Sequence, residues 1–451
     1  MTVSADELGT QDIKKLLIKQ AVPSSIGILF MSVNILIDTI FVGQWIGSLA
    51  IAAVTVVLPI TFLISSLGMA IGVGGGSVLS RALGANNREK AKTTFANQIM
   101  MTFLLSFIFV AFGLIFSNEM LLLFGAKGAI MKPAREFFFP IIISVPFLAL
   151  CMMGNNIIRA EGKAKFAMVA MIIPAFINII LDIIFIKYLD LGMFGAALAT
   201  AISYFSCFLF VLWFFLFKSE LKLRTRHFKF KLLIVKEISE LSIVTFSRQG
   251  VVSILAIILN HTLYTYGGEH SVAIYGIISR MLMFALFPIL GITQGFLPIA
   301  GFNYGAQNYE RVKESVQLSI KYAAILASLI FVVILLFAKP IVSVFTTDPK
   351  VIAETPEALR WVFAASPVIA IQLIGAAYFQ AAGKAKKALL LTLSKQGFFL
   401  IPLVLILPNF LGIFGIWIAF PIADILSTIL TGYFLKKEIH TKLIQTTNGI
   451  L

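Results

Sequence analysis

Two acidic side chains stand out because they interrupt segments that are otherwise apolar. Asp38 follows Asn34 by four residues, and Asp182 follows Asn178 by the same interval. In a helix this interval places two side chains on one face. Each pair therefore predicts a polar face on an apolar helix, where a charged group is costly and generally marks a function.

A third helix is predicted to add hydroxyl groups, because Thr200 and Tyr204 are again one turn apart. If the three helices converge, they form a pocket of two carboxylates, two amides and two hydroxyls. Two carboxylates in an apolar surrounding cannot both be ionised cheaply. Such a pair can take up a proton near neutral pH or bind Na⁺ through oxygen atoms. The alternative is that the two acids are unrelated and cap backbone groups where helices break.

The composition requires these helices to lie in a membrane. The chain has 451 residues, of which 59% are hydrophobic and 13% charged, and its mean hydropathy is +0.98. Soluble domains are about 45–50% apolar and about 25% charged. Soluble and disordered classes are therefore excluded. The net charge of +15 is attributed to basic loops on one side of the membrane, and no nucleic-acid partner is expected.

Twelve apolar segments are long enough to cross a bilayer, which takes about 20 residues. An all-α membrane protein is predicted, since an open sheet cannot satisfy its backbone in lipid. The segments lie near residues 21–42, 50–80, 95–116, 137–158, 166–186, 193–217, 239–265, 271–300, 316–337, 359–380, 388–408 and 411–435.

The distribution of Lys and Arg predicts the orientation. These residues concentrate at both termini and in the connections after the even-numbered spans, above all at 218–236. Cytoplasmic loops carry such an excess. The expected location is the plasma (inner) membrane, crossed several times, with both termini cytoplasmic.

Three repeated motifs indicate an internal duplication. Residues 84–92 resemble 305–313, Gly162-Lys-Ala-Lys is repeated from Gly383, and Leu191-Gly-Met-Phe-Gly resembles the segment from Leu411. The predicted organisation is an N-terminal six-helix bundle at 1–217, a cytoplasmic basic linker at 218–237 and a C-terminal six-helix bundle at 238–451. A pseudo-two-fold axis along the membrane normal is expected to relate the bundles, as in many secondary transporters.

The second half carries other charges within its spans, namely Arg248, Arg280, Lys395 and Asp424. They form either structural pairs, such as Lys395 with Asp424, or the lining of a central cavity where they bias substrate binding. Asp38 and Asp182 have no acidic counterparts in this half, which favours a function in the N-terminal bundle.

No motif supports catalysis. The glycine-rich segment 72–77 lies in an apolar helix, where close helix packing is expected. The four histidines lack metal-ligand spacing, and no nucleophile–base pair is evident. The chain is predicted not to be an enzyme and to need no cofactor beyond a coupling ion, H⁺ or Na⁺.

These features together resemble the multidrug and toxic compound extrusion (MATE) family. The resemblance rests on the 6+6 duplication, Pro23 ahead of Asn34 and Asp38, the Asn178/Asp182 pair, Thr200, and the Gly-Ala-Asn-Asn and Gly-Ala-Gln-Asn motifs. The DinF-like branch is the most similar. The resemblance implies a cation or proton site at Asp38, Asn178, Asp182 and Thr200 and a hinge at Pro23. The NorM-like branch also uses acids in helices seven and ten, where only the terminal Glu269 and Glu357 occur here.

The resemblance further implies an antiporter that exports amphipathic, often cationic drugs and toxic compounds by alternating access. Na⁺ or H⁺ would couple at the same acids, and the chain would act as a monomer in contact with membrane lipid. One alternative is a flippase for lipid-linked precursors from the same superfamily. The major facilitator superfamily also has twelve spans, but its charged signature between helices two and three is missing from residues 80–92.

Overall fold

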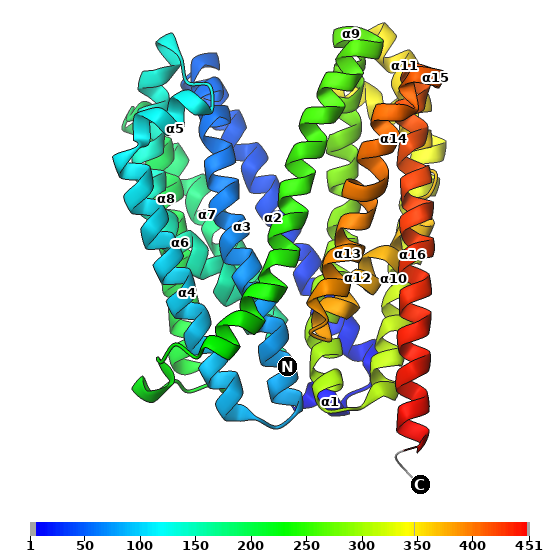
Figure 1. The fold of residues 1–451 in the computed structure, drawn as a ribbon. Coiled ribbons are helices and arrows are strands. Elements are labelled where there is room, and N and C mark those ends of the chain that lie inside the picture. Colours follow the sequence, from blue (N-terminus) through cyan, green and yellow to red (C-terminus); the bar gives the residue numbers. More distant parts are fainter. Residues whose placement is uncertain (1–5, 347, 449–451) are drawn as a thin grey trace. The chain divides into compact units, whose positions relative to one another are not determined.

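Helices account for the regular structure of this protein in a computed structural model that describes residues 6–346 and 348–448 (Figure 1). Within those ranges no strand is present. Eleven of the helical segments are long and apolar enough to cross a membrane. Together with the apolar composition, they make this chain a multi-pass membrane protein.

The chain divides into two compact units. Unit 1 comprises Ile26–Thr245 and the described residues before Gly9, whereas unit 2 comprises Gly9–Ser25 and the residues from Phe246 onwards. The first and the longest helix therefore each contribute residues to both units. The linker and domain boundaries expected from the sequence stay a prediction.

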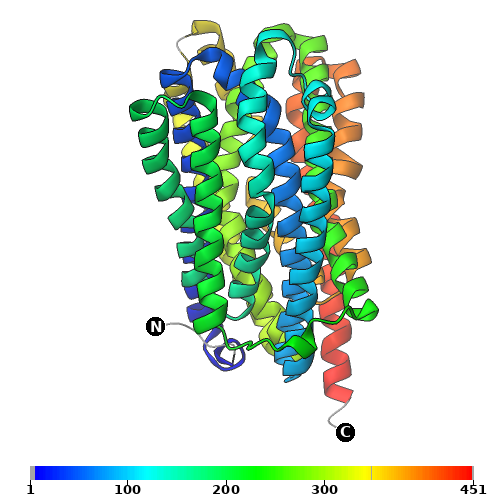
Figure 2. The same ribbon diagram turned by 90° about the vertical axis from the view of Figure 1, so that its left-hand side faces the viewer.

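Unit 1 is built around α6, whose apolar window is the most thoroughly buried in this unit. The helices of this unit run alongside one another (Figure 2). They are α1 (Glu7–Thr10, shared with unit 2), α2 (Ile13–Trp45, shared), α3 (Ser48–Gly84), α4 (Arg88–Ile115), α5 (Ser117–Leu123), η1 (Gly128–Ile130), α6 (Met131–Ala160), α7 (Ala164–Asp182), the π-helical turn η2 (Ile183–Tyr188), α8 (Gly192–Phe217) and η3 (Thr225–His227).

A stripe of glycines lets α3 approach α6 closely. Gly68, Gly72 and Gly76 recur every four residues and face α6. A Cβ atom on Gly68 would lie 2.6 Å from the carbonyl oxygen of Ala149, and one on Gly72 would lie 2.9 Å from the Cα of Met153. Small residues at this spacing allow helix backbones to pack in membranes, where the hydrophobic effect supplies little driving force. This glycine-rich segment therefore allows close helix packing.

Unit 2 contains Gly9–Ser25 and resumes at Phe246 in the long helix α9, which is shared with unit 1 and reverses direction partway along. Its helices are α9 (Leu232–Gly305), α10 (Tyr309–Phe345), α11 (Pro349–Phe363), η4 (Ser366–Val368), α12 (Ile369–Ala381), α13 (Ala385–Leu393), the π-helical turn η5 (Ser394–Leu400), α14 (Ile401–Ile406), α15 (Pro408–Leu411) and α16 (Ile413–Asn448). At ~1.5 Å per residue a straight α9 would far exceed the ~30 Å of a bilayer. Gly268 has φ 65° and ψ −166°, a conformation that is essentially restricted to glycine. The helix is therefore two successive spans.

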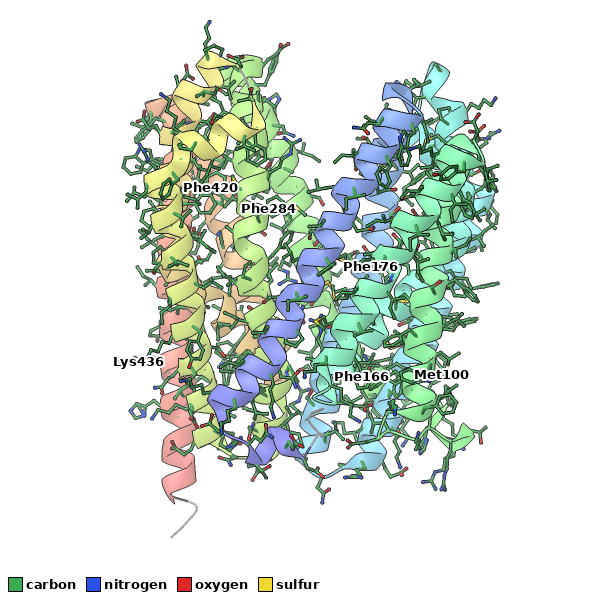
Figure 3. All side chains as sticks on the ribbon, turned by 180° about the vertical axis from the view of Figure 1, so that it is seen from behind. Met100, Phe166, Phe176, Phe284, Phe420 and Lys436 are labelled. Carbon is green, nitrogen blue, oxygen red and sulfur yellow. The ribbon has the colours of Figure 1, made fainter. Side chains whose placement is uncertain are left out.

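With α9 divided at Gly268, each of the twelve predicted spans corresponds to a helical segment. The predicted all-α membrane fold is therefore confirmed. Many large apolar side chains remain exposed, including Leu329 and Leu336 on α10, at 62% and 65%. Figure 3 shows how densely side chains cover the helices, with Phe176 on α7 and Phe284 on α9 labelled. Such surfaces suit contact with lipid.

The duplicated motifs adopt matching backbone conformations. Asn86 and Gln307 have φ values of 54° and 58°, and Gly162 and Gly383 have 79° and 78°. Asn86 and Gln307 are each followed by an asparagine that caps the next helix. The Asn87 side chain accepts a hydrogen bond from the N–H of Lys90, and the Asn308 side chain accepts one from the N–H of Arg311. The motifs are repeated because both halves need the same left-handed turn and the same N-cap.

A buried acid fastens the turn after α6 to the end of α8. Glu161 is fully buried; the Ser219 hydroxyl donates to its carboxylate at 2.5 Å, and the N–H of Glu220 donates at 3.2 Å. Lys163 adds an ion pair with Glu220 at 3.3 Å. Burial raises the pKa of Glu161 to about 7, although Ser219 and Lys163 oppose the rise.

The glycine stripe predicts that Gly68→Ala lowers the thermal stability, because the new methyl group meets the backbone of α6. Overpacking of this kind costs about 1–3 kcal/mol. Gly76→Ala is the matched control, since its Cβ would lie 3.6 Å from its nearest neighbour, an ordinary contact. The measurement is the fraction of purified protein that stays monodisperse after heating in detergent. Equal stability of the two variants would contradict the packing argument.

Glu161 predicts that stability falls as the pH rises from about 4.5 to about 7. The folded protein holds a proton on this carboxyl group that the unfolded chain has lost, so folding is favoured at low pH and loses that contribution through the folded pKa. The effect is on the order of 3 kcal/mol at most. Glu161→Gln should therefore flatten the dependence of the melting temperature on pH.

The exposed acid Glu119 provides the control, because Glu119→Gln should leave that dependence unchanged. Parallel pH curves for the wild type and Glu161→Gln would show that Glu161 does not hold the proton.

Candidate functional site

The first candidate site lies in unit 1, where α2, α7 and α8 contribute polar side chains to one cluster. The Asn34 amide donates to the side-chain oxygen of Asn178 at 3.0 Å, and the Asn178 amide donates to the Thr200 hydroxyl at 3.4 Å. The Thr200 hydroxyl in turn donates to the carbonyl of Ala196 at 3.1 Å. A chain of hydrogen bonds therefore links the three helices that the sequence predicted to converge.

Two acids complete this cluster. The carboxyl groups of Asp38 and Asp182 influence each other electrostatically. Asp182 has no exposed surface, and among the described residues no donor group gives either of its oxygens a hydrogen bond; the same is true of Oδ1 of Asp38. Two ionised carboxylates in this position would repel each other and lack compensation. A shared proton or a bound monovalent cation would satisfy both.

The local helix geometry explains how Asp182 reaches this position. Asp182 ends α7, and the π-helical turn η2 follows directly. Such turns are rare and are often found at functional sites. Tyr204, one turn after Thr200 on α8, interacts electrostatically with Asp38 and so belongs to the same cluster.

Pro23 lies inside α2 and is buried. A proline within a helix removes one backbone hydrogen bond and favours a kink. The Ser24 hydroxyl donates to the carbonyl of Gln20 at 2.8 Å, which supports the helix beside the proline. The boundary between unit 2 and unit 1 falls between Ser25 and Ile26 of α2, so Pro23 lies close to this boundary. Its role as a hinge stays a prediction.

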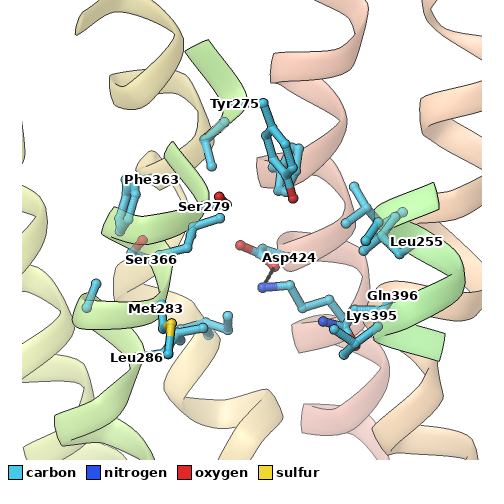
Figure 4. A pocket seen from close by; sticks show the side chains of 18 of the residues that line it. Leu255, Tyr275, Ser279, Met283, Leu286, Phe363, Ser366, Lys395, Gln396 and Asp424 are labelled. Carbon is cyan, nitrogen blue, oxygen red and sulfur yellow. Dashed lines mark ion pairs between the residues drawn. The ribbon is translucent and has the colours of Figure 1, made fainter. Parts of the chain in front are cut away.

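The second candidate site is a cavity of about 530 Å³ inside unit 2 (Figure 4). Lys395 and Asp424 both line it, and their side chains form an ion pair of 2.6 Å. The side chains are 17% and 5% exposed. The Lys395–Asp424 pair expected from the sequence is therefore present and faces a cavity within unit 2, whereas the lining of a central cavity that biases substrate binding stays a prediction.

Other charged residues from the sequence analysis lie elsewhere. Arg280 is exposed and Arg248 is half-buried, and neither lines this cavity. The cavity instead has polar groups that the sequence analysis did not single out as site residues: Asn260, Tyr275, Ser279, Ser366 and Gln396. Only the adjacency of Gln396 to Lys395 and the alignment of Asn260 with Asn34 in the repeat could have pointed to them.

Neither site resembles a transition-metal centre. Among the residues that the structure describes, no three His, Cys, Asp or Glu side chains gather in a way that could hold a metal ion. The unit 1 cluster offers carboxylate, amide and hydroxyl oxygens, which are the ligands of hard cations. This set of oxygen atoms is suited to a proton or a small cation.

Comparison with protein families identifies a match to the MatE model over residues 23–184 and 246–406. The matched ranges include both candidate sites except Thr200, Tyr204, Phe420 and Asp424. Among curated proteins, the chain is similar to the multidrug export protein MepA of Staphylococcus aureus (strain N315), with 27% identity over 95% of each chain.

Solved structures are also similar. A MATE protein crystallised in the bent conformation shares 27% identity, with a TM-score of 0.93 over 99% of this chain and 100% of the other. A MOP superfamily transporter from Pyrococcus furiosus, described as having a binding pocket of reverse polarity that suggests a different function, shares 28% identity, with a TM-score of 0.91 over 98% and 99%. Assignment to the DinF-like branch stays a prediction.

The ion pair in the cavity predicts strong coupling between its two members. Lys395→Met alone leaves a buried carboxylate without its partner and should lower the stability by on the order of 3 kcal/mol. Asp424→Leu alone should be similarly unfavourable, whereas the double variant should be close to the wild type. A double-mutant cycle of thermal stability in detergent measures the coupling.

The exposed Lys321 on α10 supplies the control, since Lys321→Met should be neutral. A double variant as unstable as the sum of the single variants would refute this coupling.

Proposed function

This chain belongs to the MatE family, and on that premise we propose that it exports amphipathic organic compounds, many of them cations, in exchange for H⁺ or Na⁺. Its curated relatives are named multidrug export proteins, which supports a transporter rather than an enzyme. The excess of Lys and Arg in alternate connections supports a location in the plasma (inner) membrane with cytoplasmic termini. The chain acts as a monomer.

The observation that carries the coupling is the Asp38–Asp182 pair, whose buried oxygens lack hydrogen-bond donors. A proton or Na⁺ bound between these acids removes their mutual repulsion. Release of the ion restores the repulsion, so separation of the two carboxylates becomes favourable. Ion occupancy and the separation of α2 from α7 are therefore linked.

The substrate is moved by alternating access. Binding of the ion from outside changes the contacts of α2 with its neighbours, and α2 responds at Pro23. Similar MATE structures have been solved in a bent and in a straight conformation, which supports a transporter with two conformations. The 42 Phe and 14 Met residues of the chain provide adaptable apolar surfaces for varied drug shapes.

The energy of one ion is sufficient for this task. One charge that crosses a potential of about 100 mV releases ~2.3 kcal/mol. Because each tenfold concentration ratio costs ~1.4 kcal/mol, one ion per cycle sustains a ratio on the order of fifty-fold for a substrate without net charge. For a cationic substrate the exchange moves no net charge, and the concentration gradient of the ion drives it.

The proposal predicts that Asp38→Asn and Asp182→Asn each abolish gradient-driven transport, because an amide cannot exchange a proton or balance a cation. The assay follows ethidium in proteoliposomes, with a pH gradient imposed in one set and a Na⁺ gradient in another. The gradient that drives transport by the wild type identifies the coupling ion.

The matched control is Asp190→Asn. Asp190 is exposed and has φ 52°, a conformation that asparagine also tolerates, so this variant should transport normally. Full activity of both Asp38→Asn and Asp182→Asn would refute the coupling site. A wild type that leaves ethidium unmoved under either gradient would instead favour the flippase.

A further inference from the structure

The cavity in unit 2 combines an apolar lining with one positive and one negative side chain. Leu255, Leu286 and Phe420 are among its apolar residues. Lys395 and Asp424 lie on opposite elements of the lining, the turn η5 and the helix α16, and point toward each other (Figure 4). The cavity therefore carries no net charge from this pair, although both charged groups are present within it.

This arrangement is unfavourable for a ligand that carries a single charge. A cation that approaches Asp424 must displace the Lys395 ammonium, which then remains in the same cavity without a partner. An anion that approaches Lys395 must displace the Asp424 carboxylate, which then remains in the cavity without a partner. Loss of one partner from a buried ion pair is strongly unfavourable. The pair therefore acts as a barrier to binding of simple cations and simple anions.

A ligand with both charges does not meet this barrier. Its cationic group replaces the ammonium at Asp424, while its anionic group replaces the carboxylate at Lys395. Four charges then alternate in sign, and none is left without a partner. We propose that the unit 2 cavity binds an amphipathic zwitterion in this way, with its apolar body against the leucine and phenylalanine side chains.

The other features of the cavity agree with this occupant. Its volume of about 530 Å³ lies within the range of small-molecule sites, about 300–1,000 Å³. Lys395 has a flexible side chain on a π-helical turn, so its ammonium can move away from Asp424 without a change in α16. Asn260 and Met283, which also line the cavity, are exposed and provide a route of entry.

The two units consequently differ in the ligands that they favour. The unit 1 cluster has two acids that interact with each other and suits a proton or a small cation. The unit 2 cavity has a balanced pair and suits a zwitterion. Transport of such a ligand rests on the proposed export function, whereas its binding can be measured without any gradient.

The test compares two dyes that differ in net charge and by one ethyl group. Rhodamine B is a zwitterion near neutral pH, and its ethyl ester is a cation with the same ring system. Binding to the purified protein in detergent is followed by fluorescence anisotropy. The wild type should bind rhodamine B at least about tenfold more tightly than the ester, because the ester cannot pair with Lys395.

Three variants locate this preference. Lys395→Met should reverse it, since an unpaired Asp424 attracts the cationic ester. The double variant Lys395→Met/Asp424→Leu should bind both dyes alike, and its expected stability makes it the safeguard against misfolding. Lys321→Met, on an exposed position of α10, should behave as the wild type.

The outcomes separate this inference from the export function. Equal affinity of the wild type for the two dyes, or a preference that persists in Lys395→Met, would overturn the zwitterion site even if ethidium is still exported. A preference that reverses in Lys395→Met supports the site even if export driven by a gradient fails.

Discussion

The contact between Asp38 and Asp182 is the constraint to which the rest of unit 1 conforms. Two carboxylates interact where no donor of the protein reaches the oxygens of Asp182. In a lipid-embedded helix bundle this arrangement is stable only while a proton or cation neutralises it. The amide and hydroxyl groups around the acids hold the three helices in position, but they do not supply the missing charge. The proposed proton or cation would supply that charge.

The two halves of the duplicated chain differ in how their buried charged groups are arranged. Matching turns at Gly162 and Gly383 show that both halves keep the same backbone. Unit 1 brings together two acidic groups, for which we propose an ion from solution as the partner. Unit 2 brings together opposite charges in Lys395 and Asp424, which neutralise each other. Duplication thus supplied the scaffold twice, and side-chain substitution gave each copy its own electrostatics.

The sequence predicted the spans and the convergence of the polar residues, because both depend on local pattern. Apolar length defines a span, and a four-residue interval places Asn178 and Asp182 on one face. It did not predict the π-helical turns after Asp182 and around Lys395, since these depend on tertiary packing. The partition of α2 between the two units could not be predicted from the sequence either. Arg248 and Arg280 lie in apolar segments of the sequence, as Lys395 and Asp424 do, but the structure places neither of them at the cavity.

The position of Asn34 explains why an ion in unit 1 can act on a whole helix. Asn34 and Asp38 lie one turn apart on α2, so this helix contacts α7 through an amide and through a carboxyl group. The amide contact is a neutral hydrogen bond to Asn178, which does not depend on the ion. The carboxyl contact changes from attraction to repulsion when the ion leaves. Because one contact is constant and the other switches sign, the force on α2 acts about a fixed point near Asn34. Under the proposed coupling, a force of this kind would rotate or bend α2, and Pro23 inside this helix is the proposed hinge.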